Sequence, residues 1–316
     1  MDNRSPICPF LDEYGVMILD GGLATELESR GYDLADELWS ARVLLEDPEA
    51  IRQLHRDYLA AGADCIITAS YQGTVAGFMK RGLDEADAEA LLRSSVTLAV
   101  DARDSFWREP ANRIGRRKPI VAASVGPYGA YLADGSEYTG RYDLDEAGLK
   151  EFHRRRWQLL AATDADILAC ETIPSIAECR ALAQLLLETP GRWAWFSFSC
   201  KDAQHISDGS RLADCLSFLD DIGPVAAVGI NCTSPVHVPG LLREARAATA
   251  KPLVLYPNSG EMYDAESKRW SGRTDANDFA QSCQEWQAAG AWVIGGCCRT
   301  GPEHIRQIRG RLIEDD

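Results

Sequence analysis

The feature that most constrains the fold is an eightfold alternation of short apolar runs with amphipathic helical stretches. Each run has the length and the apolar or β-branched content of a buried strand. Strict alternation of strands and helices predicts parallel strands joined by helical crossovers. The predicted strands cover residues 16–19, 65–68, 119–124, 167–170, 194–198, 226–230, 252–256 and 292–294.

Helix starts are visible between these runs. Ser175 and Thr300 are each followed by glutamate three residues later, which is the spacing of a capping box. Eight strand-helix units without a long polar linker favour a single-domain (β/α)8 TIM-type barrel, residues 1–316, over an open doubly wound sheet. The acidic Asp-Gly-Gly segment at residues 20–22 is too short for the dinucleotide fingerprint of the open fold. In such a barrel, chemistry is expected where strands end and the following loops begin.

Charge and cysteine usage narrow the class of protein. The net charge of −15 argues against nucleic acid or an anionic membrane as a partner. No apolar run approaches the ~18 residues of a membrane span, and residues 1–12 lack the apolar segment of a secretory signal. The ten cysteines are mostly scattered through apolar runs, which indicates reduced thiols. We therefore expect a cytoplasmic protein, and the oligomeric state stays open.

Three cysteines follow the ends of two predicted strands. Cys232 comes after the sixth strand, and Cys297 and Cys298 come after the eighth. Adjacent residues on a strand face opposite sides, so both could bind one ion only if Gly295 and Gly296 end the strand first. Three thiolates would leave one position of a tetrahedral zinc ion open, which is typical of a catalytic site. The alternative is three buried thiols without a metal.

Carboxylates follow the first and fourth predicted strands. Asp20 could bind a substrate or, alternatively, cap the helix expected at residues 24–30. Glu171, followed by Thr172, comes directly after an apolar run and is expected near the barrel axis. A buried carboxylate needs a partner, and a substrate ammonium group would serve.

Further polar and aromatic groups are expected at the same end of the barrel. A polar cluster that includes Ser70, Tyr71 and Gln72 follows the second strand and could bind a polar ligand. Two long loops, residues 126–141 and 257–273, carry aromatic side chains that could hold a sulfonium or ammonium group, or could only pack the loops down. None of the five histidines has metal-binding spacing, which disfavours a zinc hydrolase. A thiol-based sensor is a second alternative, although it would not need these carboxylates.

Six segments near the predicted strand ends carry a further signal: residues 20–27, 68–72, 124–131, 171–172, 229–232 and 295–300. Together they resemble the motifs of the homocysteine S-methyltransferase family, and the resemblance runs over residues 20 to 300. Residues 132–138 and 256–261 resemble the branch that uses S-methylmethionine more than the betaine-dependent or cobalamin-dependent branches.

The resemblance implies a zinc-dependent methyltransferase that converts homocysteine to methionine. The metal, Zn²⁺, would be held by Cys232, Cys297 and Cys298. The donor would be S-methylmethionine or S-adenosylmethionine. Asp20 and Glu171 would hold the amino group of homocysteine, with backbone near Gly21 helping to seat it. Further substrate contacts are expected from Thr172, Ser70 and Asn231, and contacts with the methyl donor from Tyr71, Gln72, Tyr128 and Tyr256.

Overall fold

Eight parallel strands form one sheet in the computed structural model, which describes residues 4–34, 40–260, 262–264, 269–271 and 275–314. Parts of the 257–273 loop, including its aromatic side chains Tyr263 and Trp270, therefore lie outside the described residues. The strands are β1 (Met17–Ile18), β2 (Cys65–Ile67), β3 (Ile120–Val125), β4 (Ile167–Ile173), β5 (Ala194–Phe198), β6 (Val225–Asn231), β7 (Leu253–Tyr256) and β10 (Ala291–Ile294). All eight predicted strands are confirmed.

The sheet curves into a nearly closed barrel. Its order is β1-β10-β7-β6-β5-β4-β3-β2, so chain neighbours are also spatial neighbours. The last gap, between β1 and β2, is bridged where Leu19 pairs with Cys65. Two backbone hydrogen bonds cross it, from the N–H of Asp20 to the Cys65 oxygen at 3.0 Å and from the N–H of Asp64 to the Ile18 oxygen at 2.7 Å. The predicted barrel fold is thus confirmed.

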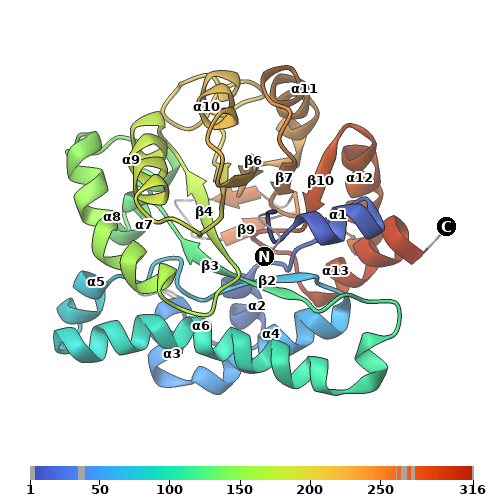
Figure 1. The fold of residues 1–316 in the computed structure, drawn as a ribbon, viewed down its shortest axis with the longest axis horizontal. Coiled ribbons are helices and arrows are strands. Elements are labelled where there is room, and N and C mark those ends of the chain that lie inside the picture. Colours follow the sequence, from blue (N-terminus) through green and yellow to red (C-terminus); the bar gives the residue numbers. More distant parts are fainter. Residues whose placement is uncertain (1–3, 35–39, 261, 265–268, 272–274, 315–316) are drawn as a thin grey trace.

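Helices surround the strands (Figure 1). The β7–β10 connection also holds a two-stranded hairpin, β8 (Met262–Asp264) with β9 (Arg269–Ser271). The longer helices are α4 (Pro48–Ala61), α6 (Glu85–Arg108), α8 (Glu146–Ala161), α9 (Ile176–Leu187), α10 (Leu212–Asp220), α11 (Val238–Ala248), α12 (Ala276–Ala288) and α13 (Pro302–Arg309). The shorter ones are α1 (Cys8–Tyr14), α2 (Leu23–Ser29), α3 (Ser40–Glu46), α5 (Val75–Lys80), α7 (Tyr128–Leu132), η1 (Pro110–Arg113), η2 (Ser136–Tyr138), η3 (Pro235–His237) and η4 (Gly310–Glu314). No helix in the described ranges is long and apolar enough to cross a membrane.

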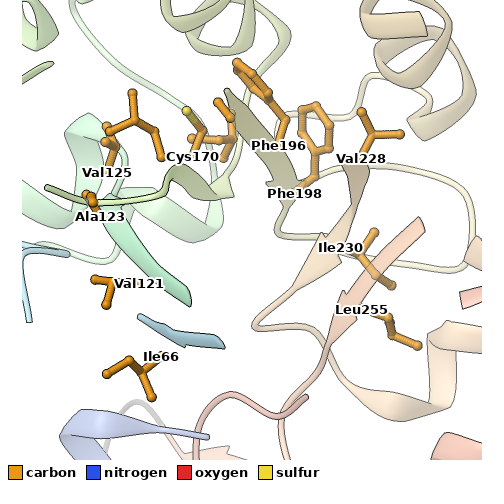
Figure 2. Packing of buried hydrophobic residues seen from close by; sticks show 14 of the residues in the cluster. Ile66, Val121, Ala123, Val125, Cys170, Phe196, Phe198, Val228, Ile230 and Leu255 are labelled. Carbon is orange, nitrogen blue, oxygen red and sulfur yellow. The ribbon is translucent and has the colours of Figure 1, made fainter. Parts of the chain in front are cut away.

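Alternate strand residues fill two layers of the core. On β3, Val121 and Ala123 belong to the outer cluster beneath the helices, part of which Figure 2 shows, whereas Ala122 belongs to the cluster inside the barrel. This alternation follows from the period of two in a strand. Ile7, the N-cap residue of α1, and Phe10, within α1, join the inner cluster. Apolar side chains thus fill the barrel interior, and polar groups gather where the strands end.

The capping predictions are half right. Ser175 caps α9 by accepting the N–H of Glu178 at 3.2 Å, as predicted. Helix α13, however, begins after Gly301 and not after Thr300. The Thr300 hydroxyl donates instead to the backbone oxygen of Cys297 at 2.6 Å. This threonine therefore fixes the cysteine turn, and that use competes with helix capping.

Candidate metal centre and active site

The three cysteine sulfurs gather at the carboxyl ends of β6 and β10. All three Sγ atoms lie within 4.8 Å of one another, and those of Cys232 and Cys298 are 3.8 Å apart. Cys232 follows the last residue of β6 and has a left-handed φ of 49°, while its N–H donates to the Tyr256 oxygen at 3.2 Å. A non-glycine residue in this region is strained, and such strain is concentrated at functional sites.

The second strand end supplies a tight turn. Strand β10 ends at Ile294, and Cys297 and Cys298 lie beyond it, as the predicted break at Gly295 and Gly296 requires. The N–H of Cys297 donates to the Pro257 oxygen at 2.8 Å. A Cβ atom on Gly296 would collide with the side chain of Thr300, so only glycine fits the turn.

The sulfur geometry fits zinc. Tetrahedral zinc binds thiolates at about 2.3 Å, which places the sulfurs about 3.8 Å apart. The Cys232–Cys298 separation matches this spacing. Hydrogen bonds from Cys297 and Cys298 hold the pKa of Cys232 well below its usual range, so one thiolate forms readily. Soft thiolate ligands select zinc over magnesium, calcium and manganese, which prefer oxygen ligands.

Strand β4 carries the candidate carboxylate on a bulge. The sequence predicted that β4 ends at Cys170, but the strand continues to Ile173, and its pairing with β5 shifts register between these residues. Thr172 has a φ of 59°. The side chain of Asn231 holds this conformation, because its Oδ1 accepts the Thr172 N–H at 2.7 Å and its Nδ2 donates to the Thr172 hydroxyl at 2.8 Å. Thr172 and Asn231, both predicted as substrate contacts, therefore shape the backbone around Glu171.

Glu171 is buried, with 7% of its surface exposed. The Ser124 hydroxyl donates to one carboxyl oxygen, and the Tyr256 hydroxyl donates to the other at 3.1 Å. Burial raises the pKa of Glu171 to about 7 despite these two bonds. Tyr256 is buried and bonds this carboxyl group, and its expected contact with the methyl donor stays a prediction.

Asp20 supplies a second buried carboxylate, with only 2% of its surface exposed. Its Oδ2 accepts the N–H of Ile67 at 2.8 Å, and its Oδ1 has no hydrogen-bond partner among the described residues. Asp20 does not cap α2, whose N-cap is Gly22. Burial, together with the charge of Glu171, raises the pKa of Asp20. Two neighbouring buried carboxylates, one with an open oxygen, call for a cationic partner.

The segment after β2 lies beside Ser124 and Thr172, and its side chains are largely engaged with neighbouring residues. The Ser70 hydroxyl donates to the Ser124 oxygen at 2.8 Å and so supports the serine that contacts Glu171. The Gln72 amide donates to the Ala130 oxygen at 3.1 Å. The side chain of Tyr71 lies within hydrogen-bonding reach of the Thr172 side chain. Gly21 packs so closely against the Thr300 oxygen that a Cβ would collide with it.

The β3–α8 loop, which holds α7 and η2, reaches the thiols through a tyrosine that the prediction did not single out. The Tyr138 hydroxyl lies 3.5 Å from the Cys232 sulfur. Tyr128, the predicted donor contact, packs in an aromatic cluster with Tyr142 and Phe152, at centroid distances of 5.3 and 4.7 Å. The structure thus brings Tyr138 rather than Tyr128 to the metal-binding residues. Only the loop's aromatic content hinted at this.

A fully buried polar network ties this loop to α8 and α9. Glu178 accepts the Tyr128 N–H at 2.6 Å and lies 2.7 Å from His153 Nε2. Arg156 contacts His153 Nδ1 at 2.7 Å and donates to the Gly126 oxygen. Because a guanidinium group can only donate, Nδ1 must accept, so neutral His153 carries its proton on Nε2 and donates it to Glu178. Burial lowers the pKa of His153, which favours this neutral form.

The fold and the site together define a class: a (β/α)8 barrel with a three-thiol metal site and buried carboxylates at the carboxyl ends of its strands. A family model described as homocysteine S-methyltransferase matches residues 17–312. The chain belongs to the homocysteine S-methyltransferase family.

Named relatives agree over nearly the whole chain. The chain is 55% identical over 304 residues to homocysteine S-methyltransferase YbgG of Bacillus subtilis, and the match covers 96% of each chain. It is 49% identical over 312 residues to the homocysteine S-methyltransferase of Escherichia coli, covering 98% of this chain and 100% of the relative. The metallated form of homocysteine methyltransferase MmuM from Escherichia coli has a TM-score of 0.87 at 47% identity, covering 97% of this chain and 100% of the other.

Proposed function

We propose that this chain is a zinc-dependent homocysteine S-methyltransferase that takes its methyl group from a sulfonium donor, S-methylmethionine in preference to S-adenosylmethionine. The single observation that carries the proposal is the cluster of three thiols, each within 4.8 Å of the others, beside two buried carboxylates. Cys232, Cys297 and Cys298 would hold the metal. Three protein ligands leave one position for a substrate sulfur.

The two carboxylates would bind the amino group of homocysteine. Glu171 has both oxygens in hydrogen bonds from hydroxyl groups, whereas Asp20 keeps Oδ1 open. An ammonium group between them would offset the cost of two buried negative charges and use the open oxygen. Asn231 and Thr172 act on this step indirectly, because they fix the backbone bulge that presents Glu171.

The residues around the thiols suit methyl transfer from a cation. When bound, a zinc ion held by three thiolates would favour the thiolate form of homocysteine while leaving its sulfur nucleophilic. The carboxylates orient the amino acid end of homocysteine. Transfer from a sulfonium releases a neutral thioether, so no general acid is needed at the donor. Orientation of the two substrates then becomes the main contribution, and it can supply about 7 to 11 kcal/mol.

A direct assay tests the proposal and ranks the donors. Purified zinc-loaded protein is incubated with homocysteine and, in separate reactions, S-methylmethionine, S-adenosylmethionine or betaine, and methionine is quantified. We expect the highest kcat/KM with S-methylmethionine. A higher value with betaine would contradict the sulfonium donor but leave the homocysteine site intact. No methionine from any of these donors would contradict the proposed function.

A further inference from the structure

Glu137 is a carboxylate near the thiols that no step described so far uses. It lies in η2, within the β3–α8 loop. Its backbone is fixed from two sides, because the Ser199 hydroxyl donates to its oxygen at 3.1 Å and Gly129 packs against its nitrogen too closely to admit a Cβ. The next residue, Tyr138, places its hydroxyl 3.5 Å from the Cys232 sulfur. The position of Glu137 relative to the thiols is therefore set by the fold.

The carboxyl group of Glu137 has an unmet need for positive charge. Its Oε2 atom is buried and has no hydrogen-bond partner among the described residues. Its carboxyl group lies near Cys232 and Tyr71. A buried carboxylate oxygen without a partner is costly unless a cation joins it.

The two substrates of the proposed reaction offer cations in different places. The ammonium group of homocysteine is matched by Asp20 and Glu171, and the hydroxyls of Ser124 and Tyr256 fix Glu171 within the barrel. Glu137 belongs instead to the β3–α8 loop, whose Tyr138 contacts Cys232. The donor carries an ammonium group and a sulfonium group, and it is the methyl carbon on the sulfonium that must come close to the homocysteine sulfur for transfer. The sulfonium is therefore the donor cation that lies nearest the thiols.

We propose that Glu137 is the counter-charge for the sulfonium group of the methyl donor, and that it makes the site selective for cationic donors. This inference rests on the proposed function and deepens it. Tyr138, whose hydroxyl lies 3.5 Å from the Cys232 sulfur, and Tyr71, which lies near Glu137, can add cation–π attraction. Transfer turns the sulfonium into a neutral thioether, so the attraction to Glu137 is lost with the reaction. This loss favours release of the product.

The test uses zinc-loaded Glu137→Gln protein, which keeps the side-chain shape and removes the charge. We expect the KM for S-methylmethionine to rise at least about tenfold, with the KM for homocysteine and the zinc content unchanged. Trimethylsulfonium, which lacks an amino group, should bind correspondingly more weakly by calorimetry. The matched control is Asp134→Asn on the same loop, which retains the Oδ1 acceptor for the Ser136 N–H and should leave both KM values within about twofold.

Other outcomes separate this inference from the proposed function. Equal increases in both KM values would assign Glu137 a structural role. An unchanged KM for S-methylmethionine, or weaker S-methylmethionine use with unchanged trimethylsulfonium binding, would overturn the contact with the sulfonium. If Glu137→Gln fails to fold, Glu137→Asp keeps the charge and should retain trimethylsulfonium binding, and its loss would contradict the proposal. Absence of methionine formation by the unsubstituted protein would instead contradict the proposed function, while trimethylsulfonium binding would still test Glu137.

Discussion

Glu171→Gln should stabilise the substrate-free protein at pH 8 and weaken its binding of homocysteine. Burial raises the pKa of Glu171 from 4.5 to about 7, so the folded protein holds this proton up to a higher pH than the unfolded chain does. The free energy of unfolding therefore falls as the pH rises between these two values. A difference of about 2.5 pKa units corresponds to about 3 kcal/mol at pH 8. A neutral amide avoids this loss and still bonds Ser124 and Tyr256.

Thermal unfolding of the zinc-loaded protein without substrate measures the effect. About 3 kcal/mol corresponds to a rise in Tm of about 4–5 °C for a chain of 316 residues. At pH 5 the advantage should shrink to below about 1 kcal/mol, because the folded glutamic acid is then neutral too. The KM for homocysteine should rise at least about tenfold at pH 8 through loss of the ammonium contact. As a control, Glu151→Gln at an exposed site should change neither.

Two results would refute this reasoning about Glu171. One is a variant less stable than the unsubstituted protein at pH 8, which would mean that the carboxylate is well solvated or paired. The other is an equal advantage at pH 5 and pH 8, which would mean that no proton is linked to the effect. An unchanged KM for homocysteine with the expected pH dependence would keep the electrostatic account and remove Glu171 from the substrate site.

Two further substitutions test the supporting contacts. Asn231→Ala should lower the free energy of unfolding by about 1–3 kcal/mol, because it leaves the buried Thr172 N–H unpaired. It should also raise the KM for homocysteine. Unchanged stability in urea would contradict the role of Asn231 in holding Thr172. His153→Leu should lower the free energy of unfolding by about 2–4 kcal/mol, because Glu178 and Arg156 each lose a hydrogen-bond partner. A glutamine at this position can accept from Arg156 and donate to Glu178, so His153→Gln should recover most of the loss. Equal urea midpoints for the two His153 variants would contradict the assigned bonding.

The sequence predicted most of the fold because strand content and helical crossovers are local patterns with a known architecture. The positions of the cysteines after two strand ends, and the break at Gly295 and Gly296, followed from the same reasoning. The bulge at Thr172 could not be predicted, since it depends on the side chain of Asn231, 59 residues away. The single-domain organisation of residues 1–316 and the individual substrate contacts stay predictions.

Competition for hydrogen bonds explains the difference at Thr300. Thr300 was predicted as a helix cap, but its hydroxyl bonds the Cys297 oxygen. The contacts of Tyr256 and Tyr128 with the donor stay predictions, and both side chains also serve the scaffold, since Tyr256 bonds Glu171 and Tyr128 packs against Phe152. Aromatic residues near a barrel mouth can serve either the ligand or the scaffold, and only the packing of distant segments decides between these uses.

X-ray absorption at the zinc edge tests the central claim most directly. The zinc-loaded protein should hold one zinc ion per chain bound by three sulfurs at about 2.3 Å, and homocysteine should raise the sulfur count to four. Cys298→Ala should lose the metal while its far-UV circular dichroism stays nearly unchanged, because the barrel has its own core. Fewer than three sulfurs without substrate, or a sulfur count that homocysteine does not change, would contradict a three-cysteine zinc site that binds the homocysteine sulfur.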